Sequence, residues 1–393
     1  MEDYLKPETA LPVDGLAGTL VGRAWVPGEF PGPSVVLLRE DGVHDISRLA
    51  PTMSDLLDLD DPARHAREAA GARIGDVSEI LANSHADIRN PDLPYFLAPI
   101  DLQAVKAAGV TFIASLLERV VEEQARGNPE KAEAIRAHIT DLIGTSLAEM
   151  KPGSDAAMRL KAHLVAEGGW SQYLEVGIGP DVEVFTKAQP LSSVGTGSLI
   201  GIRPESTWNN PEPEIVLAVS SGGMVKGATL GNDVNLRDFE GRSALLLPEA
   251  KDNNASCAIG PFIRLFDATF SMDDVRRAHV SLLVEGQRDG YRLEGLSAMS
   301  QIARDPLDIV EQTIGEHHQY PDGLVLFLGT MFAPTEDRGE PGLGFTHKLD
   351  DLVVIRSERL GALANRVTTC DAAPPWSFGI RALMRNLQAR GLL

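Results

Sequence analysis

The sequence predicts an α+β fold, mainly β, in which a β-roll or barrel carries peripheral helices and a smaller domain precedes it. Short apolar runs separated by Gly, Pro and Asn turns fill the chain after residue 171. These runs do not alternate with regular helices, which argues against a doubly wound sheet. Residues 101–170 instead carry apolar residues at helical spacing with dense charge.

The first hundred residues predict a small α/β domain of their own. Gly15 to Trp25 alternates in the manner of a strand, and Val35–Leu38 is an apolar run followed by turn-forming residues. A helix is expected around Met53–Ala70, and Leu93–Ile100 has the composition of a linker. We therefore expect an N-terminal domain over residues 1–100 and a catalytic domain over residues 101–393.

The larger part begins with predicted helices and continues with predicted strands. Helices are expected over Leu116–Gln124, Pro129–Leu147 and Leu160–Glu167, as a helical lid or insert at about residues 111–170. The expected strands are Tyr173–Ile178, Asp181–Lys187, Glu214–Ser220, Val225–Gly231, His279–Glu285, Leu324–Phe327 and Leu352–Ile355.

The composition excludes several classes of function. The 393 residues carry a formal net charge of -20, so no basic surplus is available to neutralise nucleic-acid phosphates. No apolar stretch reaches the roughly 18 residues that span a bilayer, and the N-terminus lacks the features of a signal peptide. We expect a cytoplasmic protein without a membrane partner. The two cysteines, Cys257 and Cys370, form no CxxC pair, which excludes a zinc ribbon.

Two glutamates in the stretch WNNPEPEIV have the spacing of a metal site. Pro213 disfavours a helix here, and on an extended strand Glu212 and Glu214 point to the same side. Two adjacent carboxylates repel each other unless a cation separates them. Their hard oxygen atoms suit Mg²⁺, Mn²⁺ or Ca²⁺. The alternative is an exposed strand edge with solvated glutamates.

A third carboxylate follows nineteen residues after Glu214, in the stretch GNDVNLRD. Asp233 comes after a strand-like run, between small polar residues that favour a turn, and could complete a set of three ligands. The alternative is an Asx-turn. Because three carboxylates outweigh one divalent ion, a further cation is expected nearby, and Arg237 and Lys251 are the candidates. In a buried site the pKa of Lys251 could be lowered, which would let it act as acid or base.

The stretch FLGTMF ends an apolar strand in Gly-Thr. A backbone N–H group there and the hydroxyl of Thr330 could bind a carboxylate. A plain strand-to-loop turn is equally consistent with this pattern.

Five motifs occur in the order found in the fumarylacetoacetate hydrolase superfamily, which residues 101–393 resemble. They are NNPEPE, GNDVNLRD, the lysine before Ile-Gly-Pro, FLGT, and LDD with GALANRV. The resemblance implies a β-roll C-terminal domain, a homodimer or dimer-based tetramer, and a small 2-keto acid as substrate. It also implies Mg²⁺, with Mn²⁺ or Ca²⁺ as possible substitutes, bound by Glu212, Glu214 and Asp233.

The resemblance also assigns roles to residues around the metal. It implies that Lys251 is catalytic and that Thr330 with the Ser192-Ser193 loop contacts the substrate carboxylate. Further candidates for substrate contacts are Ser115, Arg119, Lys187 and Arg237.

One departure separates this chain from the hydrolases of that family. Their pattern Gly-x-Asn-Tyr-x-x-His-x-x-Glu aligns with residues 109–118, and Ser115 stands at the place of the histidine. A serine does not take a proton at neutral pH without a base of its own, so hydrolysis of a diketone is disfavoured. The variant GVTF, together with WSQYLE, resembles the sugar-acid dehydratase branch. That branch implies Mg²⁺-dependent dehydration of 2-keto-3-deoxy-D-xylonate to 2-oxoglutarate semialdehyde in oxidative pentose breakdown.

Such a dehydration needs a base at C3 and an acid at the leaving C4 hydroxyl. The candidates are Lys251, Glu183 on the strand entering the site, and Glu118 on the predicted lid helix; their roles stay open. Three alternatives remain: C–C hydrolysis of a 2,4-diketo-3-deoxy sugar acid, dehydration of 2-keto-3-deoxy-L-arabinonate, and a non-catalytic scaffold. The intact carboxylate set argues against the last.

Overall fold

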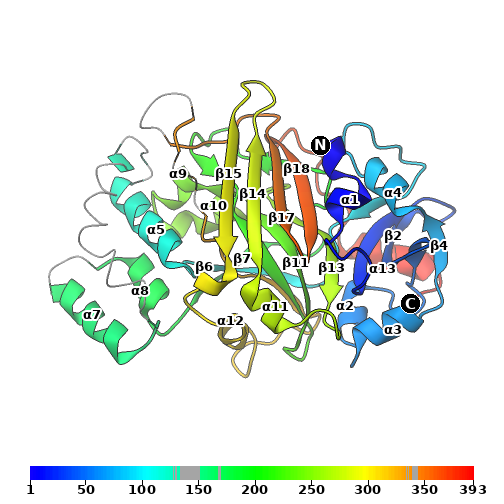
Figure 1. Ribbon diagram of the computed structural model, residues 1–393, viewed down its shortest axis with the longest axis horizontal. Coiled ribbons are helices and arrows are strands. Elements are labelled where there is room, and N and C mark those ends of the chain that lie inside the picture. Colours follow the sequence, from blue (N-terminus) through cyan, green and yellow to red (C-terminus); the bar gives the residue numbers. More distant parts are fainter. Residues whose placement is uncertain are drawn as a thin grey trace.

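The structure is a computed structural model that describes residues 1–126, 128, 131–132, 151–166, 170–332, 334, 336–338 and 344–393. It has the predicted α+β, strand-rich architecture, with N-terminal elements at one end and a group of helices at the other (Figure 1). None of the helices in these ranges combines the length and the apolar character that crossing a bilayer requires.

One long sheet combines the N-terminal strands with strands from the middle and later part of the chain. Its order is β4-β3-β2-β1-β13-β11-β10-β16-β6-β7, and β5 also pairs with β1. The N-terminal strands meet the rest where β1 pairs with β13, at Leu20↔Arg264 and Val21↔Ile263. The bounds are β1 Leu20–Val26, β2 Gly32–Arg39, β3 Gly42–Asp45, β4 Ala72–Gly75, β5 Tyr95–Leu97, β6 Ala104–Gly109, β7 Glu183–Ala188, β10 Pro213–Val219, β11 Val225–Asp233, β13 Cys257–Leu265 and β16 Leu324–Phe327.

A second sheet of order β15-β14-β17-β18-β8 packs against the first. Leu217 and Leu230 of the long sheet share the main core with Leu282 and Ile355 of the second, so burial between the sheets stabilises both. The bounds are β8 Leu199–Ile202, β14 His279–Glu285, β15 Arg292–Ala298, β17 Leu352–Ser357 and β18 Gly361–Thr369. A short ladder joins β9 (Asn209–Asn210) to β12 (Asn235–Leu236).

The helix expected around Met53–Ala70 is two helices, α2 (Met53–Leu57) and α3 (Pro62–Glu68). The break lies at Asp61, whose side chain accepts the Arg64 N–H group as an N-cap, and Pro62 occupies the first turn. The other short elements at this end are η1 Glu2–Tyr4, α1 Pro7–Ala10 and α4 Val77–Asn83.

The strand predicted at Tyr173–Ile178 is wrong, because this segment forms helix α8 (Gln172–Ile178). The Ser171 side chain caps it, and its buried Leu174 packs in one cluster with Leu116 of α5 (Ile113–Ala125). Burial against another helix decided the conformation over local alternation. Helix α7 (Asp155–Ala166) lies at the same end (Figure 1). Most of the predicted helix Pro129–Leu147 lies outside the described residues.

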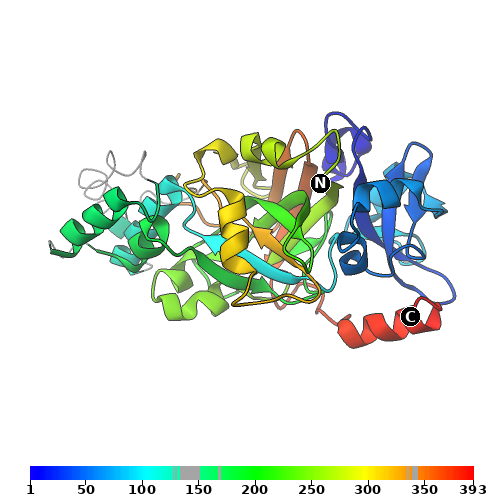
Figure 2. The same cartoon turned by 90° about the horizontal axis from the view of Figure 1, so that it is seen from below.

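The last helix, α13 (Ile380–Ala389), returns to the N-terminal end (Figure 2). Asn386 donates to the Pro31 carbonyl at 3.0 Å, and Arg390 pairs with Asp45 at 3.1 Å. The division into 1–100 and 101–393 stays a prediction. The remaining helices are α9 Arg237–Glu240, η2 Ala244–Leu246, α10 Leu247–Lys251, α11 Met272–Arg277, η3 Met299–Gln301 and α12 Pro306–Thr313.

Candidate active site

Three buried carboxylates come together where two strands meet. Each of Glu212, Glu214 and Asp233 offers an oxygen atom, and these atoms lie within 4.8 Å of one another. The start of β10 pairs with the end of β11, with Glu214 opposite Gly231, and the Asp233 N–H group donates to the Glu212 carbonyl at 3.0 Å. The antiparallel register therefore brings two stretches, nineteen residues apart, into one cluster.

The glycine of the FLGT motif holds one of these carboxylates. The Gly329 N–H group donates to Glu214 Oε2 at 2.6 Å. Gly329 has a φ of 87°, and a β-carbon there would collide with the Thr111 hydroxyl, so only glycine fits. The carboxylate that this backbone group binds is thus a side chain of the protein itself.

Two buried lysines supply positive charge to the cluster. The Lys251 amine lies 2.5 Å from Glu212 Oε2 and 3.0 Å from Asp233 Oδ2. The Lys187 amine lies 2.8 Å from Asp233 Oδ1 and donates to the carbonyls of Val234 and Lys251 at 3.0 and 2.5 Å. Of the two candidate cations, Lys251 contacts the carboxylates, whereas Arg237 contacts Glu122 instead.

The electrostatics of the three carboxylates suit a divalent cation. Burial raises the pKa of Glu214 well above its usual value, and the neighbouring charges of Asp233 and Glu212 add to this. Burial also opposes ionisation of Asp233, but Lys187 and Lys251 outweigh it and lower the pKa of Asp233. A hard cation among these oxygen donors would offset the remaining repulsion, so the residues fit a Mg²⁺ or Mn²⁺ site.

The pKa of Lys251 differs from the expectation. Burial acts to lower the pKa of this amine, but the charges of Asp233, Glu212 and Glu240 outweigh burial and raise it. Without a metal, Lys251 is therefore a cation that balances the carboxylates.

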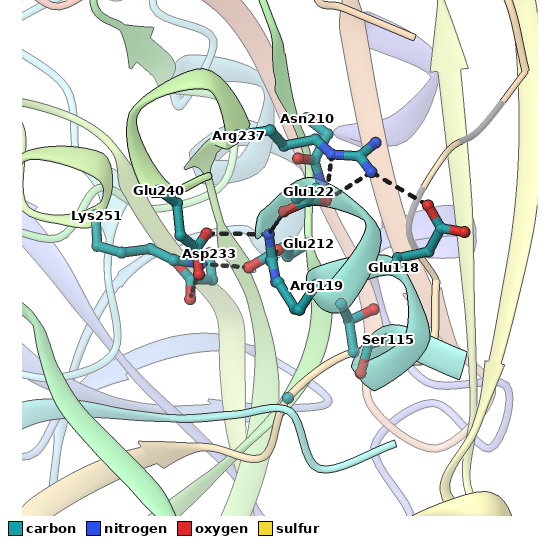
Figure 3. A network of polar contacts seen from close by, with 12 residues as sticks. Ser115, Glu118, Arg119, Glu122, Asn210, Glu212, Asp233, Arg237, Glu240 and Lys251 are labelled. Carbon is teal, nitrogen blue, oxygen red and sulfur yellow. Dashed lines mark hydrogen bonds and ion pairs between the residues drawn. The ribbon is translucent and has the colours of Figure 1, made fainter. Parts of the chain in front are cut away.

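Helix α5 contributes an arginine that three glutamates share (Figure 3). Arg119 Nη1 lies 2.6 Å from Glu122 and 3.0 Å from Glu240, and Arg119 Nη2 pairs with Glu212 Oε1. On its other side Glu122 accepts from Arg237 Nε at 2.6 Å. This chain of buried charges joins α5 to α9 and to the start of β10.

A small cavity lies beside these groups, with about 350 Å³ of empty space when the open solvent at its mouth is included. It is lined by eight residues that the sequence singled out and by six that it did not. The eight are Ser115, Arg119, Glu183, Glu212, Glu214, Asp233, Lys251 and Thr330. The six are Ala108, Gly109, Val110, Phe185, Glu240 and Gly329.

Glu183 has the proton affinity that acid–base work near neutral pH requires. Burial raises the pKa of its carboxyl to about 7, and the nearby charge of Glu240 adds to this, whereas Arg119 and Lys251 act in the opposite direction. Gly109 makes room for this side chain, because a β-carbon there would overlap the Glu183 carboxylate.

Five predicted residues do not line this cavity. Lys187 is fully buried and contacts Asp233. Arg237 contacts Glu122, and its Nη2 atom lies 3.5 Å from Oε2 of Glu118. Ser192 donates to the Gln189 carbonyl at 2.8 Å, and Ser193 donates to Cys257 Sγ at 3.4 Å. Their roles in catalysis or substrate binding stay predictions.

The sequence did not single out Glu122 and Glu240. Glu122 lies three residues after Arg119, and this spacing on a helix is typical of an ion pair, so that signal was available. Glu240 follows the GNDVNLRD motif by two residues and reads as an ordinary polar helix residue. Only the tertiary structure places it at the cavity.

Parts of the chain are similar to known proteins. Residues 194–368 match the family described as fumarylacetoacetate (FAA) hydrolase C-terminal. A probable 2-keto-3-deoxyxylonate dehydratase from Haloferax volcanii is 33% identical over 198 residues, which is 50% of this chain and 64% of that protein. A 2-dehydro-3-deoxy-D-arabinonate dehydratase from Saccharolobus solfataricus is 30% identical over 186 residues, or 47% of this chain and 58% of that protein. The matches span less than two thirds of either relative.

Solved structures with the same fold extend further along the chain. A 2-keto-3-deoxy-D-arabinonate dehydratase complexed with magnesium and 2,5-dioxopentanoate superposes with a TM-score of 0.61 at 21% identity, covering 89% of this chain and 99% of that one. Its apo form superposes with a TM-score of 0.62. At this level of identity the likeness shows a common fold, which confirms the predicted fold class.

Proposed function

We propose that this chain, whose residues 194–368 match the fumarylacetoacetate (FAA) hydrolase C-terminal family, is a divalent-metal-dependent dehydratase of a 2-keto-3-deoxy sugar acid. The observation that carries the proposal is one cavity lined by both a buried three-carboxylate cluster and a carboxyl with a pKa of about 7. Both relatives are named as dehydratases of such acids.

In the proposed reaction the protein binds the acid, a proton leaves C3, and the C4 hydroxyl takes up a proton and departs as water. The resulting C3=C4 alkene then isomerises: protons leave C5 and its hydroxyl and return to C3 and C4, which gives the aldehyde. Mg²⁺ held by Glu212, Glu214 and Asp233 would act as a Lewis acid on the keto oxygen. Glu183 would take the C3 proton, because its carboxyl changes its protonation near neutral pH. Thr330 at the cavity wall would contact the substrate. Lys251 would balance the charge of the cluster.

The specific substrate that we propose is 2-keto-3-deoxy-D-xylonate, with 2-oxoglutarate semialdehyde as product in oxidative pentose breakdown. 2-Keto-3-deoxy-L-arabinonate, its enantiomer with the opposite configuration at C4, is the second candidate. We also propose a homodimer or a dimer-based tetramer. C–C hydrolysis is disfavoured because the Ser115 hydroxyl donates to the Phe112 carbonyl at 2.9 Å and offers no base for water.

Purified protein with Mg²⁺ is expected to convert 2-keto-3-deoxy-D-xylonate to the semialdehyde with loss of one water. Mass spectrometry of the product identifies the reaction, and the rates measured in parallel with the L-arabinonate enantiomer identify the preferred substrate. EDTA should abolish turnover and added Mg²⁺ should restore it. Release of pyruvate instead, or full turnover after exhaustive chelation, would reject the proposal.

Replacing Gly109 by alanine is expected to lower turnover roughly 10- to 100-fold, because the added β-carbon displaces the Glu183 carboxylate. Steady-state kinetics should show the loss mainly in kcat. Gly222→Ala is the matched control, since a β-carbon there meets only the Ser220 hydroxyl at 4.0 Å. Equal kcat values for the two variants would contradict the placement of Glu183.

A further inference from the structure

Both oxygen atoms of Glu212 are already engaged by cations of the protein. Arg119 takes Oε1 from the side of helix α5, and Lys251 takes Oε2 at 2.5 Å from the opposite side (Figure 3). A metal ion bound by Glu212 needs at least one of these oxygen atoms. Each carboxylate oxygen keeps a second lone pair, so a metal can bind beside these contacts. Its positive charge would repel both protein cations, however, and would weaken the hold of Arg119 or of Lys251 on Glu212.

Cations of the protein already offset much of the charge of the cluster. Its three carboxylates carry a formal charge of -3, and three cations form ion pairs with them: Lys187, Lys251 and Arg119. A divalent ion would bring further positive charge next to these buried cations, which is costly. An anion that enters together with the metal offsets part of this added charge, and the carboxylate of a 2-keto acid is such an anion.

Of the three cations, Arg119 is the one that can change partner. Lys187 is fully buried and also held by two backbone carbonyls. Lys251 bridges two members of the cluster. The Arg119 side chain is 11% exposed and lines the cavity, and Glu122 and Glu240 hold its other nitrogen. Its guanidinium can leave Glu212 without leaving the cavity.

We infer that Arg119 exchanges partners during binding: it occupies Glu212 in the metal-free protein and passes to the substrate carboxylate when the metal takes Glu212. The identity of the anion rests on the proposed function; the competition at Glu212 rests on the contacts alone. Arg119 thereby couples the two binding events. A metal that binds alone competes with Arg119 for Glu212. When metal and 2-keto acid bind together, the metal pairs with Glu212 and Arg119 pairs with the carboxylate of the acid.

The experiment measures Mn²⁺ binding by isothermal titration calorimetry, with and without pyruvate, a 2-keto acid that has no C4 hydroxyl to lose. For the wild-type protein, pyruvate is expected to tighten Mn²⁺ binding roughly tenfold. Arg119→Met should bind Mn²⁺ alone roughly tenfold more tightly, and pyruvate should then change its affinity by less than about twofold. Mn²⁺ affinity that is weaker than or equal to wild type, or coupling that is retained, would overturn the exchange.

Arg237→Met is the matched control, because it removes the same charge from the same network without contact to Glu212. If Arg119 exchanges partners, the Arg237→Met variant should keep the coupling between pyruvate and Mn²⁺ binding. Loss of coupling in both variants would show that any loss of nearby positive charge has this effect, and would count against the exchange. Circular dichroism checks folding. If Arg119→Met does not fold, Arg119→Gln, which keeps a polar group for Glu122, is expected to give the same two changes.

The outcome is separable from the proposed function. If Mn²⁺ and pyruvate behave as described but no 2-keto-3-deoxy acid is dehydrated, the proposed reaction fails and the exchange stands. If the sugar acid is dehydrated but Arg119→Met keeps the coupling, the exchange fails and the reaction stands.

Discussion

Glu214→Gln is expected to lower turnover roughly 10³-fold, equivalent to about 4 kcal/mol of transition-state stabilisation, while the protein stays folded. The amide keeps the size of the side chain and still offers an oxygen to the Gly329 N–H group, which lies 2.6 Å from Glu214. It removes one of the three anionic metal ligands that we propose. Mn²⁺ binding should weaken at least roughly a hundredfold, as seen by calorimetry.

The same substitution should not destabilise the metal-free protein. Burial and the charges of Asp233 and Glu212 raise the pKa of Glu214, so its ionised form is costly in the fold, and a neutral amide avoids that cost. Thermal unfolding in EDTA is therefore expected at the same temperature as wild type or higher. Glu183→Gln is the control for metal binding and should keep wild-type Mn²⁺ affinity. An active, metal-binding Glu214→Gln protein would remove the basis of the proposed site.

Glu183→Gln is expected to lower kcat by roughly 10²- to 10⁴-fold, as the loss of a general base does. The wild-type protein should show kcat/KM rising with pH up to about 7, where the Glu183 carboxyl ionises, and levelling above it. The rate is expected to rise with pH because a general base acts in its ionised form, and the ionised fraction of the Glu183 carboxyl increases with pH. In the variant, the residual rate should lose this rise.

Glu240→Gln tests the cause of that pKa. Four charged groups act on Glu183: Glu240 and Glu212 raise its pKa, while Arg119 and Lys251 lower it. Removing the Glu240 charge should move the rise in kcat/KM to lower pH. If Glu183→Gln keeps both the wild-type rate and the rise near pH 7, another group is the base.

The three-carboxylate cluster was predictable because its signal is local. Pro213 excludes a helix between Glu212 and Glu214, and the period of an extended strand then puts both carboxylates on one side. Asp233 follows a run that forms β11, and the register of one antiparallel pair brings it to Glu214. Glu240 and the bond between Arg119 and Glu212 depend on how α5 and α9 pack, which no local pattern encodes.

Two secondary-structure elements show the same limit. Strand β13, which pairs with both β1 and β11, was not predicted, because Gly260-Pro261 inside it is typical of a turn. Helix α8 was predicted as a strand, because over only seven residues its apolar positions fit the period of a strand as well as that of a helix. In both cases burial between neighbouring elements determined the outcome.

The junction between β1 and β13 bears on how this protein can be divided. A fragment that starts after residue 100 would lack β1 and leave the end of β13 around Ile263 and Arg264 without its backbone partner, although this apolar strand is buried along its whole length in the intact chain. Unpaired backbone groups along such a strand recruit other chains and favour aggregation. The first hundred residues therefore protect the end of β13 within the same chain, and insertions or deletions are better placed in surface loops than at this junction.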